Sequence, residues 1–167
     1  MEIVFKPIGY VRVSVPDDVV RSSLEGVEGY VEVLPEYEAG LEGLDGFSHL
    51  IIVAYLHKIP LEGRATLKVR PRKWAKLGIP EAEIPEVGVF ATDSPYRPNP
   101  IAITIVRLLG RSGRILHVSG LDLFDGTPVL DIKPYTYSRR VDDLRVPQWY
   151  SSLLERVKTL YPNAREI

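Results

Sequence analysis

Cysteine is absent from the 167-residue sequence, which excludes disulfide bonds, thiol catalysis and cysteine-based zinc sites. Amide side chains are almost as scarce, because asparagine occurs only as Asn99 and Asn163 and glutamine only as Gln148. Proline, in contrast, occurs 14 times. Few thermolabile amides and many loop-stiffening prolines are typical of proteins from thermophiles, so we expect a heat-adapted protein.

Long hydrophobic runs are also missing. The longest, at residues 50–56, is far shorter than the roughly 18 apolar residues that a transmembrane helix needs. The sequence does not open with a basic stretch followed by an apolar segment, as a secretory signal would. We therefore expect a soluble cytoplasmic protein, and the length favours one domain.

Neither sign of charge dominates, because the formal net charge is −1. Binding of nucleic acid by bulk positive charge is thus excluded, although a local basic face is not. Arginine and lysine gather in three stretches, at residues 70–76, 107–114 and 139–140. Each stretch is either a nucleic-acid contact or a solvated surface.

Short β-rich runs separated by glycine and proline make up most of the sequence. Several alternate apolar and polar residues, for example Val31-Glu32-Val33, as half-buried strands do. The run at residues 48–57 is mostly apolar without alternation, which favours a strand covered on both sides. Ser112-Gly113 lies between two such runs and predicts a hairpin turn. We expect strands near residues 3–15, 30–34, 48–57, 65–69, 87–91, 102–109, 115–119 and 128–132.

One helix is expected, at residues 147–161. Its apolar residues recur at helical spacing, with Pro147 near the first turn and Pro162 as the stop. The resulting stripe either packs on the protein's own core or binds a partner. It consists of Trp149, Leu153, Val157, Leu160 and Tyr161.

About eight strands and one terminal helix predict a mainly β fold, either a barrel or a sandwich. A doubly wound sheet is not expected, because strands and helices do not alternate along the sequence. The sequence also contains no G-x-G-x-x-G turn, the usual mark of a nucleotide site on such a sheet.

A rigid polar loop follows the strand expected near residue 91. Pro95, Pro98 and Pro100 fix three backbone φ angles and restrict their neighbours, so the loop loses little freedom on binding a ligand. The Asn99-Pro100 unit resembles the Asn-Pro-Pro-aromatic loops of other amino-methyltransferases. In those loops, an amide oxygen and a backbone carbonyl accept hydrogen bonds from the nitrogen to be methylated. The alternative is a proline-braced structural turn.

A second cluster of polar residues lies at residues 121–135. The Asp125-Gly126 pair either closes a hairpin or belongs to a site. Asp131 and Lys133 are two apart on an expected strand and therefore point to one face. With Tyr135 they can orient a substrate or shuttle a proton, or they form a structural ion pair. The spacing of the aspartates fits neither an EF-hand nor a zinc pattern, so we expect no metal.

The three histidines differ in their surroundings. His49 lies within an apolar run, where a hydrogen-bonded core residue is commoner than a catalyst. His57 lies at the end of the same run and is better placed to line a site. His117 is typical of the exposed surface of a strand.

Three motifs connect these features to a known group of proteins. They are Phe47-Ser-His-Leu50, then Gly88-Val-Phe-Ala-Thr with Arg97-Pro-Asn-Pro-Ile101, then Leu121-Asp-x-x-Asp-Gly-Thr-Pro-Val-Leu-Asp-Ile-Lys-Pro-Tyr135. The opening Ile8-Gly9-x-Val-Arg12 also matches. Together they resemble the TsaA-like (YaeB) family of S-adenosylmethionine-dependent tRNA (N6-adenosine)-methyltransferases. The resemblance covers roughly residues 3–137, and its two long motifs are highly specific.

The resemblance implies a small closed β-barrel over residues 1–140, with residues 141–167 as a helical extension of the same domain. It implies a homodimer that binds S-adenosylmethionine near the dimer interface. The implied substrate is N6-threonylcarbamoyladenosine beside the anticodon of tRNA, which receives a methyl group on N6.

The resemblance also implies roles for individual residues. The expected cofactor-binding residues are Ser22, Ser23, His57, Lys58, Asp93, Ile103, Ser119, Gly120, Leu121 and Asp122. The expected catalytic residues are Arg97, Asn99, Asp125, Asp131, Lys133 and Tyr135.

Two positions depart from the family pattern. Asp93 stands where the family usually has arginine, and Ala102 stands where it usually has glycine. The first change reverses a charge within the most specific motif, and a carboxylate there repels the anions that an arginine would attract. Two alternatives follow, namely a barrel that methylates a different substrate and a barrel that binds the cofactor as a non-catalytic sensor.

Overall fold

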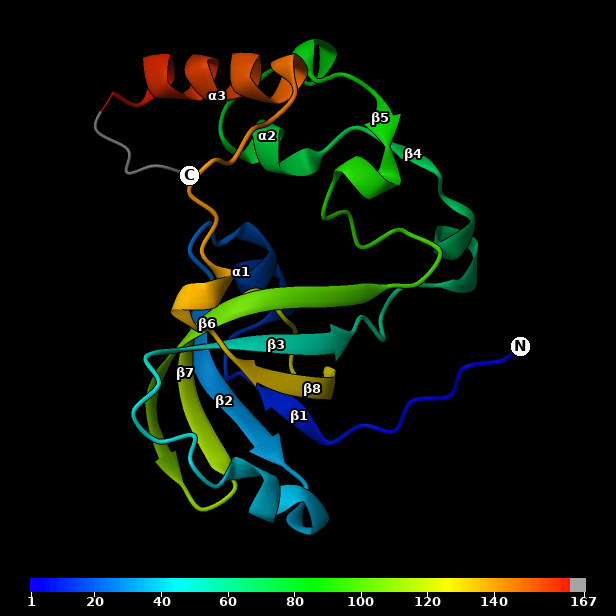
Figure 1. Cartoon of the computed structure of the whole chain (residues 1–167). Helices are drawn as coiled ribbons and strands as arrows, with labels where there is room; N and C mark the ends of the chain where they lie inside the picture. The colour runs from blue at the N-terminus through cyan, green and yellow to red at the C-terminus, as the bar shows by residue number, and fades with distance from the viewer. Residues whose placement is uncertain (163–167) are drawn as a thin grey trace. The chain divides into compact units, whose positions relative to one another are not determined.

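The computed structural model describes residues 1–162, which fall into two compact units. The first unit comprises residues 1–59 and 100–139, and the second comprises residues 60–99 and the chain from residue 140. The first is a closed antiparallel barrel with the strand order β1-β2-β7-β6-β3-β8 (Figure 1). Its strands are β1 (Gly9–Arg12), β2 (Val27–Val33), β3 (His49–Tyr55), β6 (Ile101–Ser112), β7 (Ile115–Leu121) and β8 (Pro128–Pro134). The predicted small closed β-barrel is therefore confirmed.

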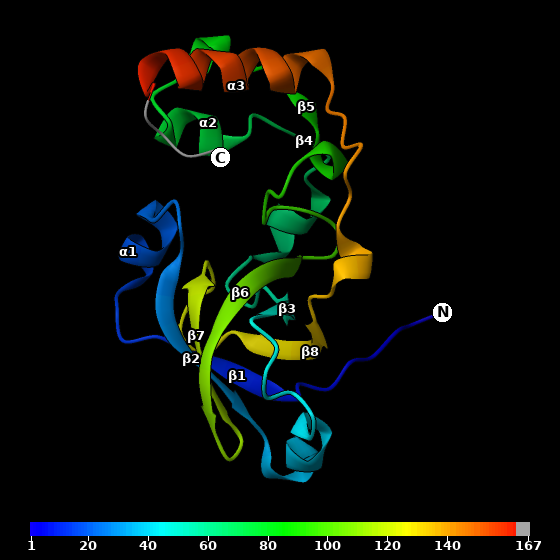
Figure 2. The ribbon, with the colours of Figure 1, turned by 60° about the vertical axis from the view of Figure 1, so that its left-hand side comes forward.

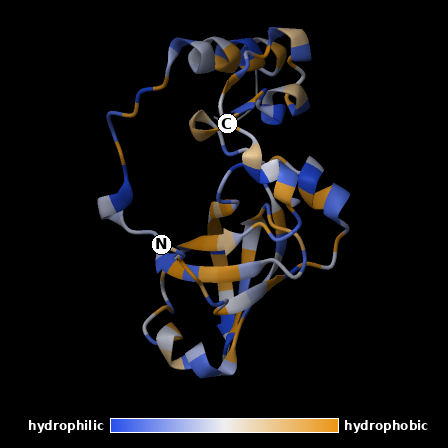
Figure 3. Ribbon diagram, turned by 90° about the vertical axis from the view of Figure 1, so that its right-hand side faces the viewer, coloured by the Kyte–Doolittle hydropathy of each residue, from blue (hydrophilic) through white to orange (hydrophobic). Residues whose placement is uncertain are grey.

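Alternating side chains fill the interior of the barrel. In β6, Thr104 and Val106 are buried, whereas Ile103 and Ile105 between and beside them are exposed. Buried apolar side chains from all six strands form one core cluster, and hydrophobic residues make up much of the barrel strands in Figure 3. The outward side chains of β3 are half-buried. The expectation that this strand is covered on both sides is thus only partly met.

The turns of the barrel follow from strand pairing. β6 and β7 form the predicted hairpin, in which Ser112 pairs with Ile115 and Gly113 adopts a φ of 55°. The Asp125-Gly126 turn closes no hairpin, because β8 pairs with β1 and β3 and not with the preceding β7. The hairpin alternative for Asp125-Gly126 is therefore wrong.

The N-terminal part of the barrel unit differs most from expectation. Of the strand expected at residues 3–15, only β1 forms, because just four residues pair with β2. The residues before it run out as an extended arm (Figure 2). The short helix α1 (Asp17–Ser22) follows Pro16 and was not predicted. Six residues are too few to establish a helical period in the sequence.

The second unit contains a small core of its own. Its elements are η2 (Leu61–Ala65), β4 (Lys68–Val69), α2 (Arg72–Lys76), η3 (Glu81–Glu83), β5 (Val87–Gly88), η4 (Val89–Ala91) and α3 (Gln148–Leu160). The predicted C-terminal helix is confirmed, and its Leu153 and Val157 pack with Trp74 of α2. Leu160 and Tyr161 of the predicted stripe are about half-exposed, at 49% each. The remaining 3-10 segments, η1 (Pro35–Leu41) and η5 (Tyr137–Arg139), belong to the barrel unit.

The described helices are short. Within residues 1–162, none has the length and apolar character needed to cross a lipid bilayer. Of the helical extension expected at residues 141–167, residues 163–167 lie outside the described part of the chain.

Candidate functional site

The outer face of the barrel at β6, β3 and β8 carries side chains whose neighbours are fixed by strand register. Along β6 and β3, Arg107 pairs with His49 and Ile103 pairs with Val53. Across the next pair of strands, Val53 pairs with Asp131. Because alternate residues of a strand point to one side, these side chains form a continuous outward surface.

The same register extends the surface at both ends. On one side, Arg107 pairs with Ser119 of β7. On the other, the backbone N–H of Tyr135 donates a hydrogen bond to the carbonyl oxygen of His49 at 3.0 Å. Five residues predicted from the sequence therefore lie on this face. They are Ile103, Ser119, Asp131, Lys133 and Tyr135.

A pocket of about 330 Å³ opens on this face, next to the start of β2. Small-molecule sites commonly measure roughly 300–1,000 Å³, so the pocket has room for a ligand or a large part of one. Two of the predicted cofactor residues, Ser119 and Gly120, contribute to its lining. The lining residues are Glu25, Gly26, Val27, Glu28, His49, Ile105, Arg107, Ser119 and Gly120.

Gly26 and Gly120 of the lining form a close backbone crossing, which we call the floor of the pocket. Gly26 adopts a φ of 75° and Gly120 a φ of 87°, both in the left-handed region that favours glycine. A Cβ atom added to Gly26 would lie 2.4 Å from the carbonyl carbon of Gly120, so no side chain fits between them. The predicted residues Ser23 and Gly120 are linked through this crossing, because the Ser23 hydroxyl donates to the Gly26 carbonyl at 2.8 Å.

Three segments with predicted cofactor residues meet around Phe124. The Lys58 ammonium lies 5.1 Å from the centre of the Phe124 ring, and the Arg21 guanidinium lies 5.5 Å from it. Lys58 also forms an ion pair with Asp17 of α1 at 2.6 Å. The structure thus brings the end of β3, the helix α1 with Ser22, and the loop after β7 together.

His57 and Leu121 differ in what they offer to a ligand. Partial burial and the adjacent Lys58 ammonium lower the pKa of His57, against a smaller opposing effect of Asp17. The imidazole is therefore neutral over a wider range of pH and is available as a hydrogen-bond acceptor. The Leu121 side chain is fully buried in the barrel core, so only its backbone is available.

The predicted pair on β8 is present. The Lys133 ammonium and the Asp131 carboxylate lie 2.6 Å apart, and both side chains are about half-exposed. The other oxygen of Asp131 accepts a hydrogen bond from the backbone N–H of Ile132 at 2.9 Å. The ion pair and this hydrogen bond hold the Asp131 carboxylate in one orientation on the outer face.

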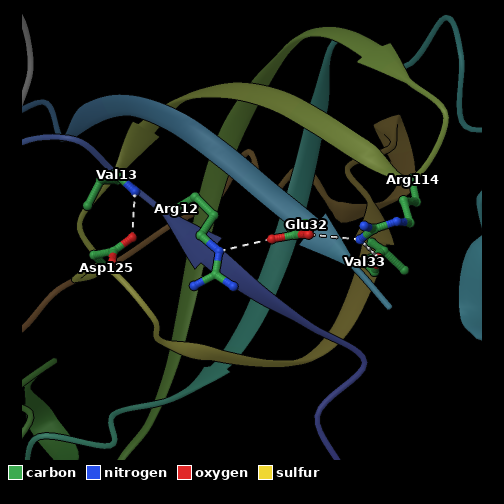
Figure 4. A network of polar contacts seen from close by, with 6 residues as sticks. All are labelled: Arg12, Val13, Glu32, Val33, Arg114 and Asp125. Atoms are coloured by element: carbon green, nitrogen blue, oxygen red, sulfur yellow. Dashed lines mark hydrogen bonds and ion pairs between the residues drawn. The ribbon is translucent and has the colours of Figure 1, made fainter. Parts of the chain in front are cut away.

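Asp125 instead fixes the turn that it begins. Its carboxylate accepts a hydrogen bond from the backbone N–H of Val13 at 3.1 Å, just beyond β1 (Figure 4). A separate network in the same view joins the Glu32 carboxylate to Arg12 and Arg114. Asp125 thus has a structural partner that its sequence motif did not reveal.

The proline-rich loop belongs to the second unit. There the Arg97 guanidinium donates to the carbonyl oxygen of Thr92 at 3.1 Å, and the Thr92 hydroxyl accepts from the backbone N–H of Ser94 at 3.2 Å. These bonds brace the loop from within. Asp93 and Asn99 are exposed to solvent.

Sequence reasoning did not single out three residues of the pocket as site residues. Glu25 has no sequence signal beyond its charge, Arg107 belongs to a basic stretch expected either to contact nucleic acid or to be solvated, and the apolar run around His49 favours a core residue. Alternation along β3 explains the error, because Leu50 points inward and its neighbour His49 therefore points outward. The identity of the residues across the sheet is decided by register, which the sequence alone does not give.

Comparison with known proteins finds similarity to tRNA methyltransferases and to a probable S-adenosyl-L-methionine-binding protein. A family model described as the tRNA-methyltransferase O N-terminal domain matches residues 14–142. A probable S-adenosyl-L-methionine-binding protein of Methanothermobacter thermautotrophicus is 39% identical over 138 residues, which cover 81% of this chain and 91% of that protein. A tRNA (adenine(37)-N6)-methyltransferase of Mus musculus is 43% identical over 98 residues, which cover 59% of this chain and 21% of the mouse protein.

Solved structures agree in fold. A crystal structure of TrmO matches with a TM-score of 0.65 and 36% identity, and the match covers 87% of this chain and 64% of that one. A crystal structure of TrmO from Pseudomonas aeruginosa matches with a TM-score of 0.61 and 32% identity over 87% of this chain and 62% of that one. This chain thus spans somewhat less than two thirds of the length of these solved relatives.

Proposed function

Because the chain belongs to the TrmO family of S-adenosylmethionine-dependent tRNA methyltransferases, we propose that it methylates N6 of threonylcarbamoyladenosine beside the tRNA anticodon. The outer face of the barrel supports this most strongly. On it, the pocket at Ser119 and Gly120 of β7 and the ion pair of Asp131 with Lys133 of β8 are separated by β6 and β3, and the pocket reaches His49 of β3, the strand next to β8. A cofactor site and a polar group able to accept a proton are the two elements that methyl transfer to nitrogen needs.

The residues at the pocket fit S-adenosylmethionine. The glycine crossing leaves a floor without side chains, and the lining carries both acidic and basic groups, as a ligand with an amino-acid end requires. We propose that backbone groups of Ser119 and Gly120 hold the cofactor, with His57, Lys58 and Ile103 beside them. When bound, S-adenosylmethionine supplies a methyl group activated by its sulfonium.

The protein's own contribution is to align the reactants and to exclude water. We assign the Asn99 amide oxygen as acceptor of a hydrogen bond from the N6–H of the substrate. Asp131, held by Lys133, is proposed to accept the proton that N6 releases, and Tyr135 to shape the face beside it. No residue of the chain forms a covalent intermediate in this scheme.

Contacts with tRNA are proposed for exposed cations. Arg72 and Lys76 of the basic stretch at residues 70–76 would neutralise phosphates, which makes the affinity fall as salt rises, while the partly buried Arg97 would brace the loop that carries Asn99. The bases of an anticodon loop are partly unstacked, so single-strand recognition by stacking suits this substrate.

A homodimer is also proposed, because isoleucines are exposed on the barrel. Alternate residues Ile101, Ile103 and Ile105 on the outer face of β6 are 36%, 72% and 51% exposed. A row of large apolar side chains in contact with water is stabilised when a second copy covers it. Sedimentation velocity would test this, and a monomer at all concentrations would contradict it.

The reaction itself is tested with methyl-labelled S-adenosylmethionine and tRNA from a matched source. Label in N6-methylated threonylcarbamoyladenosine is the expected result. Label in another nucleoside or in a small molecule would indicate a changed substrate, as the Asp93 departure allows. Cofactor binding without any transfer would indicate a sensor.

A further inference from the structure

The pocket on the barrel contains two charged side chains that nothing in the described part of the molecule neutralises. Within residues 1–162, neither the Glu25 carboxylate nor the Arg107 guanidinium has a hydrogen-bond or ion-pair partner. The other carboxylate of the lining, Glu28, is different, because it lies 2.6 Å from Nε2 of His117. Both unpaired groups line the same pocket, yet they do not pair with each other.

The position of these groups relates them to the proposed cofactor site. Ile103, Ile105 and Arg107 occupy alternate positions of β6 and face outward, so Arg107 extends the row that begins at the predicted cofactor residue Ile103. Arg107 also pairs across the sheet with Ser119, another predicted cofactor residue. Glu25 directly precedes Gly26, which crosses Gly120 at the pocket floor.

The chemistry of the two groups defines a ligand. A guanidinium binds a carboxylate through two parallel hydrogen bonds, and a carboxylate binds an ammonium. A pocket that offers one of each, with a neutral glycine floor, is complementary to a free α-amino-acid group that bears both charges.

We propose that Arg107 binds the α-carboxylate, and Glu25 the α-ammonium, of the methionyl end of S-adenosylmethionine. This assignment rests on the proposed function, because it presumes that S-adenosylmethionine is the cofactor. The threonylcarbamoyl group of the substrate also carries a carboxylate. Its amine is acylated and uncharged, however, so it gives Glu25 no cation to bind.

The test compares two ligands that differ by a single group. Isothermal titration calorimetry gives the Kd of the full-length protein for S-adenosylmethionine and for its decarboxylated analogue, which keeps the sulfonium and the amine. Wild type should bind the cofactor more tightly. Arg107→Gln should weaken binding of the cofactor by about 10- to 100-fold and leave binding of the analogue unchanged. Arg107→Lys should restore part of the affinity.

Glu25→Gln makes the complementary prediction. Both ligands keep the ammonium, so this variant should weaken the two by the same factor. Arg111→Gln is the matched control, because it removes a cation of the same strand that lies outside the pocket lining and is paired with Asp45. It should leave both Kd values unchanged. Circular dichroism and the Tm of each variant verify that the fold is kept.

Three results would overturn the assignment. An unchanged ratio of the two Kd values in Arg107→Gln would show that the guanidinium does not contact the carboxylate. If Arg107→Gln had the wild-type ratio of Kd values but lost methyl transfer to tRNA with threonylcarbamoyladenosine, Arg107 would contact the substrate and not the cofactor. Wild type that binds neither ligand would refute the proposed function itself, and the subsite with it.

Discussion

At the scale of single residues, the carboxylate of Glu32 is held between two arginines on the barrel surface. It accepts hydrogen bonds from Arg12 at 3.0 Å and from Arg114 at 2.9 Å, and these bonds, that of Arg12 first, lower the pKa of Glu32 below its ordinary value of 4.5. The folded state therefore favours the charged form. The stabilisation is present above the unfolded pKa and is lost as the pH falls through the folded pKa.

Replacement of Glu32 by glutamine should therefore remove part of the acid sensitivity of the fold. We expect Glu32→Gln to have a lower Tm than wild type at pH 7. This difference in Tm should shrink between roughly pH 5 and 3, because wild type loses its interactions of Glu32 with Arg12 and Arg114 there. Thermal unfolding followed by circular dichroism checks this. Glu36→Gln is the control, because it removes the same charge from an exposed glutamate outside the Glu32 network. A constant difference from pH 7 to pH 3 would contradict the linkage.

Asn99 is the residue on which the proposed recognition of N6 depends. Asn99→Ala removes the amide oxygen, and we expect methyl transfer to fall by at least about 100-fold, as when a positioned hydrogen-bond partner is removed. Because Asn99 is not a proposed cofactor ligand, the Kd for S-adenosylmethionine should stay within about twofold of wild type. Labelled transfer and calorimetry measure the two quantities. Equal loss of both would refute the role.

Gly26 tests the backbone crossing under the pocket. Gly43 has nearly the same φ, 78° against 75°, but nothing lies within 4 Å of an added Cβ there. Gly43→Ala should cost about 1–2 kcal/mol of unfolding free energy, the cost of the left-handed conformation alone. Gly26→Ala adds a clash with the backbone of Gly120 and should cost clearly more. Urea unfolding measures both variants. Equal losses of unfolding free energy would mean that the backbone at the crossing shifts to accommodate the added Cβ at little cost.

At the scale of elements, α3 is anchored by one side of its apolar stripe. Leu153 is 7% exposed in the core with Trp74, whereas Leu160 near the end of the helix is 49% exposed. Leu153→Ala should cost about 2–5 kcal/mol, because it leaves a cavity. Leu160→Ala should cost no more than about 0.5 kcal/mol, as at other surface positions. Chemical denaturation monitored by tryptophan fluorescence checks this, and similar losses for both would contradict the packing.

The elements that the sequence predicted are those with a clear pattern. All eight expected strands occur at least in part, because apolar runs or alternation mark them, and α3 follows from its apolar stripe. The helices α1 and α2 were missed because six and five residues contain fewer than two turns. The pairing of α3 with residues around Trp74 was also not foreseen, because packing between distant segments leaves no local pattern.

The candidate site was predictable only in part, for a related reason. Motifs pointed to Ser119, Asp131 and Lys133, which the barrel then places on one face. His49 and Arg107 are neighbours only through the register of β3 and β6. Strand register depends on closure of the whole barrel and therefore cannot be predicted from a single sequence.

At the scale of the whole molecule, charge is divided between the two units. The described residues of the second unit carry 11 lysines and arginines against 8 acidic residues, whereas the barrel unit carries 9 against 13. The second unit, with the exposed Arg72 and Lys76 of α2, is thus the better partner for a polyanion.

Removal of these two charges should weaken tRNA binding and reduce its dependence on salt. For Arg72→Ala combined with Lys76→Ala, we expect the slope of log K against log salt to become shallower by about 0.7–0.9 for each phosphate that the protein no longer neutralises. Fluorescence anisotropy with labelled tRNA at several salt concentrations measures this. Arg12→Ala combined with Arg114→Ala removes the same charge from the barrel unit and should change the slope less. Equal effects of the two double variants would contradict the assignment.

The closed barrel separates what keeps the protein folded from what it binds. Inward residues of β3, β6 and β8 fill the core, while the alternate residues of the same strands carry the pocket and the ion pair. A substitution at an outward position therefore changes ligand contacts without leaving a cavity inside. Such a scaffold is evolvable, because single substitutions on its outer face can change specificity while the packed core retains the stability that tolerates them.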